Sequence, residues 1–211
     1  METREETNMT RTRRAAFRIA LSIAGAALLP AGLPSVAAAA QAVDHLGVPG
    51  PIRFDGKSFV LAWSAQPSAG YVKQEYVPAG QAVERYEQML LLERVPGKLK
   101  AIDAANMQVQ ALKQRKASDP IVNMDLVQNP KSGEVLLDFV VSAKDRAGHV
   151  IVEWNAYRYA TIAGGEPGVM LFGVSHRAYG AENAKAFMGR LKTLRAAQMN
   201  ALAKADMPRL R

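Results

Sequence analysis

The sequence predicts an α+β domain in which an antiparallel sheet is covered by helices. Three observations support this fold class. Segments of strand composition occur twice early in the chain and four times later, and apolar residues recur at helical spacing in three other segments. The loops between the late strands are too short for the crossovers that parallel strands need. The expected order is two strands, two helices, four strands and a closing helix, which is typical of helices that cover an antiparallel sheet within one domain.

Two early strands are expected at residues 59–64 and 71–77, because both segments are rich in aromatic and branched residues. The turn composition of residues 66–70 joins them as a hairpin. Four further strands are expected to follow one another as an antiparallel meander, with Asn, Asp, Pro and Gly in the connecting loops. They span residues 121–128, 135–143, 149–162 and 169–177.

The helical segments are defined by apolar residues three and four positions apart. Val83, Tyr86, Met89 and Leu90 predict a first helix of roughly ten residues. A second helix is expected over residues 99–117, where Asp119-Pro120 ends it. The closing helix places Ala184, Phe187, Leu191, Leu194 and Leu202 on one stripe and is expected to end before Pro208.

This order of elements, together with the strand-to-helix turn Glu75-Tyr76-Val77-Pro78-Ala79-Gly80, resembles the PsbP-like α/β/α sandwich of many small exported proteins. The resemblance covers most of residues 52–203 and concerns the layout alone. That fold serves binding and assembly without one common chemistry. The resemblance therefore implies no functional residue.

Residues 1–40 have the composition of a cleaved export signal. A basic head is followed by the uncharged apolar run 19–29, then by helix-breaking Pro and Gly, and then by the small residues Ala37 to Ala40. The basic residues are Arg11, Arg13, Arg14 and Arg18. Cleavage is expected near Ala40, with a periplasmic or secreted product. The general and the twin-arginine export routes both stay open, as do Met1 and Met9 as the start.

The apolar run is about half the ~20 residues needed to span a bilayer, so no spanning helix is expected in the mature protein. Residues 41–51 have the Gly and Pro content of a linker, and residues 52–211 are expected to form a single domain. The chain has no Cys, which excludes disulfides, a lipidated Cys and thiolate chemistry.

The aromatic strand around residue 157 is the best candidate binding surface. Alternation places Tyr157 and Tyr159 on one face of the sheet and Trp154 on the other, where it is expected in the core. His149 and Glu153 share the face of Tyr157 in the same alternation. With His176, at the end of the next strand, these residues make the candidate binding face: Tyr157, Tyr159, His149, Glu153 and His176.

No nucleophile elbow, zinc-protease motif or phosphate-binding loop occurs, so no catalytic, cofactor-binding or metal-binding residue is expected. The sequence favours an exported non-enzymatic envelope protein that binds a small ligand, a lipid or another envelope component. The alternative is a periplasmic hydrolase or transferase whose pocket uses His149, Glu153 or His176. Without residues 1–40 the net charge is +6, which fits an envelope partner or an anionic surface. Nucleic acid is not expected, since export removes the protein from it.

Overall fold

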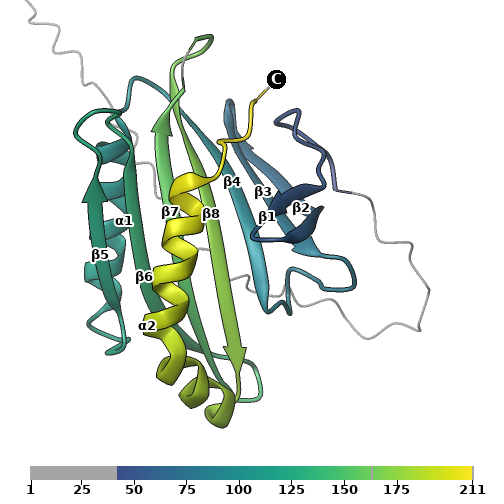
Figure 1. The fold of residues 1–211 in the computed structure, drawn as a ribbon, viewed down its shortest axis with the longest axis vertical. Coiled ribbons are helices and arrows are strands. Elements are labelled where there is room, and N and C mark those ends of the chain that lie inside the picture. Colours follow the sequence, from purple (N-terminus) through teal and green to yellow (C-terminus); the bar gives the residue numbers. More distant parts are fainter. Residues whose placement is uncertain (1–41, 163, 211) are drawn as a thin grey trace, which may run out of the picture.

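A computed structural model describes residues 42–162 and 164–210, and the predicted export signal lies outside these residues. The described chain forms an eight-stranded antiparallel sheet and two helices (Figure 1), which confirms the α+β class. The strand order is β1-β2-β3-β4-β8-β7-β6-β5. The strands are β1 (Ile52–Phe54), β2 (Lys57–Ser68), β3 (Tyr71–Pro78), β4 (Gln88–Pro96), β5 (Asn123–Gln128), β6 (Val135–Lys144), β7 (Val150–Thr161) and β8 (Gly168–Tyr179).

The two helices cover opposite faces of the sheet. Helix α1 (Ala101–Arg115) packs against β5 to β8 on one face, and helix α2 (Ala181–Lys204) crosses β6 to β8 on the other. Because side chains alternate along each strand, the sheet contributes to two separate cores. One core contains α1 with residues such as Leu137 and Leu171, and the other contains α2 with residues such as Phe172.

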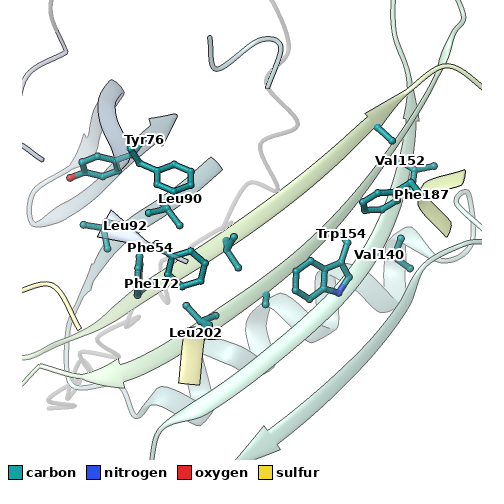
Figure 2. Packing of buried hydrophobic residues seen from close by; sticks show 14 of the residues in the cluster. Phe54, Tyr76, Leu90, Leu92, Val140, Val152, Trp154, Phe172, Phe187 and Leu202 are labelled. Atoms are coloured by element: carbon teal, nitrogen blue, oxygen red, sulfur yellow. The ribbon is translucent and has the colours of Figure 1, made fainter. Parts of the chain in front are cut away.

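The core beneath α2 is built around Trp154, which is only 1% exposed (Figure 2). Its indole nitrogen donates a hydrogen bond to Asp138 Oδ2 at 3.2 Å, which satisfies the polar end of the ring. Phe172 packs edge to face against Phe54 of β1, with 6.0 Å between the ring centres, and Leu202 closes the same core from α2. The expectation that Trp154 lies in the core is confirmed.

The helix predicted from Val83, Tyr86, Met89 and Leu90 is wrong. Residues 88–96 form strand β4, which pairs with β3 on one side and β8 on the other. Leu90 and Leu92 lie in the α2 core while Leu91 lies in the α1 core. A strand buried on both faces carries a continuous apolar run, and such a run also contains helical spacings.

The sheet thus has eight strands where the sequence predicted six, and the two that were not predicted are β1 and β4. Strand β1 has three residues, too few for a periodic signal. The other two helices form where they were expected. Helix α1 begins and ends two residues inside the predicted span, and α2 ends at Lys204, ahead of Pro208. No helix of the described residues is long and apolar enough to cross a membrane.

The predicted linker, residues 41–51, is described from residue 42 onward, and this part lies against the sheet. The backbone amides of His45 and Leu46 donate to Gln74 Oε1 at 2.7 and 3.0 Å, and Leu46 is 2% exposed. Tyr76 donates its hydroxyl hydrogen to the Val48 carbonyl at 2.6 Å. A buried leucine and buried backbone hydrogen bonds fix this segment to β3.

Candidate functional site

A cavity of about 50 Å³ lies between the sheet and α1. Its floor is formed by β3, β4, β7, β8 and part of β6, α1 covers it, and the segment between β3 and β4 forms one wall. Both apolar and charged side chains line it. The polar and aromatic lining residues are Lys73, Glu75, Tyr86, Glu93, Gln108, Phe139, Glu153, Asn155, Tyr157, Tyr159, Ser175 and Arg177.

Strand alternation explains why so many charges meet there. Lys73 and Glu75 are two residues apart on β3 and therefore share a face, which is the face of Glu93 on β4. Glu153 on β7 pairs directly with Arg177 on β8. Three carboxyl groups and two cations are thus placed on one face of the sheet.

Two of the three carboxyl groups are neutralised within the site. Glu93 forms an ion pair with Lys73 at 2.9 Å, where both side chains are less than a tenth exposed. The Glu93 carboxylate also accepts a hydrogen bond from the Tyr71 hydroxyl at 3.3 Å. A buried charge requires such compensation because removing it from water is costly.

Glu153 is compensated in the same way. Its Oε2 atom accepts a hydrogen bond from Arg177 Nε at 2.6 Å and another from the Tyr86 hydroxyl at 2.8 Å. The Arg177 guanidinium also lies over the Tyr86 ring, 4.2 Å from its centre. This arrangement ties the wall segment that carries Tyr86 to the sheet.

Glu75, the third carboxyl group, has no ion-pair partner among the described residues. Its side chain is half-buried and makes no hydrogen bond or ion pair to any described residue. Burial raises the pKa of Glu75 from 4.5 to about 7, and repulsion from Glu93 and Glu153 adds to this rise, while Lys73 and Arg177 oppose it. Carboxyl groups that lie in a cavity and have a pKa near neutrality are concentrated at functional sites.

Two amide groups face the cavity without a hydrogen-bond acceptor. Gln108 of α1 is 3% exposed and Asn155 of β7 is 1% exposed, and both line the cavity. Gln108 Nε2 and Asn155 Nδ2 have no partner among the described residues. Because an unpaired buried amide is costly, an acceptor bound in the cavity, either water or a ligand, would stabilise these groups.

Tyr157 shapes the middle of the cavity. A Cβ atom at Gly173 would lie 2.7 Å from Tyr157 Cδ1, so the absence of a side chain there lets the Tyr157 ring lie over β8. The ring also packs edge to face on Phe139 at 5.0 Å. Burial raises the pKa of Tyr157 well above its usual value, with Glu153, Glu93 and Glu75 adding to the rise, so the phenol stays neutral.

An exposed tryptophan lies beside the cavity. Trp63 of β2 pairs directly with Glu75 of β3, which places both side chains on the same face of the sheet, and Trp63 is 37% exposed. Val60, 42% exposed, pairs with Val77 on this face. The accessible side of Glu75 is therefore bordered by an aromatic and apolar surface.

The structure divides the five residues of the predicted binding face. Glu153, Tyr157 and Tyr159 line the cavity. Their face is covered by α1 and is not an open sheet surface, and Tyr159 is 3% exposed. His149 and His176 lie elsewhere.

His149 is largely exposed in the loop before β7, where its Nδ1 atom lies 3.1 Å from Asp145 Oδ2. His176 lies on the opposite face of the sheet, under α2 and against Trp154, with 6.0 Å between the ring centres. Burial lowers the pKa of His176. The two imidazoles and Glu153 therefore do not converge on one pocket.

The sequence prediction missed Glu75, Glu93, Lys73, Arg177 and Gln108. A signal for the first three was present, since charged residues within otherwise apolar strands must either be exposed or be paired. Lys73 and Glu75 alternate inside one strand, and Glu93 interrupts a continuous apolar run. Their proximity depends on the pairing of β3 with β4, and the second strand of that pair was predicted as a helix.

Among residues 42–162 and 164–210, no three His, Asp or Glu side chains are grouped so that they could hold a metal ion. The polar cavity instead has the composition expected for a small organic molecule or for ordered water.

A protein-family model matches residues 46–207, which include the sheet, both helices and the whole cavity. The chain belongs to this uncharacterised family. Nothing in the match links the family to PsbP-like proteins, so that resemblance stays a prediction. No curated protein and no solved structure matches the chain.

Proposed function

We propose that the mature protein is an exported envelope protein that binds a small polar molecule in the cavity between the sheet and α1. The observation that carries this proposal is that three polar side chains of the cavity lack an ion-pair or hydrogen-bond partner for a charged or polar group among the described residues. Among the described residues, Glu75 forms no ion pair, and the side-chain amides of Gln108 and Asn155 have no acceptor. A bound molecule that supplied these partners would offset the cost of burying them.

The size of the cavity limits the ligand. Since one water needs about 10–15 Å³ of such space, the cavity of about 50 Å³ holds roughly three to five waters or a molecule of similar size. A lipid does not fit this space. Larger ligands would have to extend from the cavity over the exposed side of Glu75.

The test is native mass spectrometry of the protein made with its own export signal and purified from the exported fraction. The measured mass is expected to match a polypeptide that begins at Gln41, which tests export and cleavage. A retained small molecule is expected in the native spectrum and not in the denatured one. Its absence from a freshly purified sample would contradict the binding proposal.

A cavity-filling variant provides the control. Ala104 of α1 is 1% exposed and lines the cavity, so Ala104→Leu is expected to displace the retained molecule. Ala197→Leu makes the same change on the exposed side of α2 and is expected to keep it. Circular dichroism establishes that both variants fold. Retention of the molecule by a folded Ala104→Leu variant would place it outside the cavity.

An enzymatic role has one observation in its favour, the pKa of about 7 at Glu75, because general acids and bases work best near the ambient pH. The same samples separate the two roles. A binding protein returns its ligand chemically unchanged after incubation at 37 °C, whereas an enzyme converts it. In the second case Glu75→Gln should abolish conversion.

A further inference from the structure

We propose that the ligand is a small primary amine whose ammonium group binds the Glu75 carboxylate and whose carbon chain lies against Trp63. This inference rests on the proposed function and specifies the ligand class for the same cavity. It depends on the charge balance of the cavity, on the position of Trp63 and on the two amides.

The charge balance favours a cation. Lys73 neutralises Glu93 and Arg177 neutralises Glu153, each through a direct ion pair. Glu75 is left as the one carboxyl group of the cavity without a cation among the described residues. A ligand ammonium would complete a third pair, and charge-assisted hydrogen bonds of this kind are among the strongest in proteins.

The neighbouring tryptophan favours the same class. Directly opposed residues of antiparallel strands have Cβ atoms about 4.5–5.5 Å apart, so Trp63 is within reach of anything bound at Glu75. The face of an indole ring attracts ammonium groups and also packs against apolar carbon. A carboxylate that lies next to an exposed aromatic ring therefore suits an amine that carries a short carbon chain.

The amides add a requirement for oxygen. Gln108 Nε2 and Asn155 Nδ2 need acceptors, which a hydroxyl or carbonyl oxygen of the ligand supplies. The cavity volume of about 50 Å³ keeps the molecule small. Ethanolamine, which has an ammonium group and one hydroxyl oxygen, is a suitable probe, and 1,2-ethanediol is its neutral counterpart of nearly equal size.

The experiment is a nuclear magnetic resonance titration of the mature protein with each probe at about pH 8, where Glu75 is mostly ionised. A probe this small lacks most of the carbon chain proposed to contact Trp63, so we expect it to bind more weakly than the retained molecule, with Kd in the millimolar range. We expect ethanolamine to bind at least about tenfold more tightly than the diol and to shift the indole signal of Trp63. The buried Trp154 serves as an internal reference.

Three variants make the result specific. Glu75→Gln is expected to weaken ethanolamine binding about tenfold or more and to leave diol binding unchanged. Glu84→Gln removes the same charge from an exposed position in the wall segment and is expected to have no effect. Trp63→Ala should weaken ethanolamine binding without unfolding the protein, because this side chain is partly exposed.

The inference is overturned if the two probes bind equally, if neither binds, or if Glu75→Gln leaves ethanolamine binding unchanged. These outcomes do not contradict the proposed function, which is tested by the molecule retained in native mass spectrometry. If that molecule is present and lacks an amine, the cavity binds a ligand of another class. If no molecule is retained, the proposed function itself fails.

Discussion

Replacement of Glu75 by glutamine should stabilise the protein at alkaline pH and have little effect at acidic pH. The pKa of Glu75 is raised from 4.5 to about 7 in the fold. Between these two values the folded state holds the proton more tightly than the unfolded state does, so the free energy of unfolding falls as the pH rises through this window. Glutamine resembles the protonated form and cannot ionise.

The magnitude follows from the two pKa values. The full difference corresponds to roughly 3 kcal/mol. Between about pH 5 and about pH 8 the loss is about 2 kcal/mol, because part of it has already occurred at the lower pH. If glutamine behaves as the protonated form, Glu75→Gln should therefore be more stable than the wild type by about 3 kcal/mol at the higher pH and by less than about 1 kcal/mol at the lower pH.

Urea unfolding at the two pH values measures this difference. The matched control is Glu93→Gln, which leaves the buried Lys73 ammonium without its partner and should destabilise the protein by about 3–5 kcal/mol. If Glu75→Gln changed the free energy of unfolding equally at both pH values, ionisation of Glu75 would not be the cause. A destabilising effect at both would show that the carboxyl group has a partner in the fold.

Two further substitutions test the packing around the site. Gly173→Ala should lower the free energy of unfolding by about 1–3 kcal/mol, because the new methyl group meets the Tyr157 ring. Gly189→Ala, in an open position within α2, should raise the free energy of unfolding by up to about 1 kcal/mol. Thermal unfolding compares the two variants, and equal effects would refute the close contact. Tyr76→Phe should cost about 1–2 kcal/mol and increase amide hydrogen exchange around Val48, because the hydroxyl holds the segment before β1; unchanged exchange there would contradict that role.

The fold was predictable to the extent that local pattern decides it. Strands β2, β3 and β5 to β8 lie where alternating composition and turn residues predicted strands, and α1 and α2 lie where helical spacing predicted helices. Strand β4 was mistaken for a helix. Its run from Met89 to Leu92 is buried on both faces, and burial of that kind follows from its central place in the sheet.

The candidate site was predictable only in part. The alternation of one strand predicts Glu153, Tyr157 and Tyr159 as binding residues, and all three line the cavity. The residues that complete the site come from β3, β4, β8 and α1. His149 and His176 are predicted as site residues only because imidazole groups can bind ligands or transfer protons. The structure places His149 in an exposed loop and His176 beneath α2.

The sequence by itself determined the secondary structure of most segments, the absence of disulfide chemistry and the prediction of an export signal over residues 1–40. These properties depend on composition and on spacing along the chain. The tertiary structure alone decided that α1 covers the tyrosine face and that the carboxyl groups of three strands meet beneath it. It also left Glu75 without an ion-pair partner among residues 42–162 and 164–210, since ion pairing depends on strand register across the sheet, which no local pattern encodes.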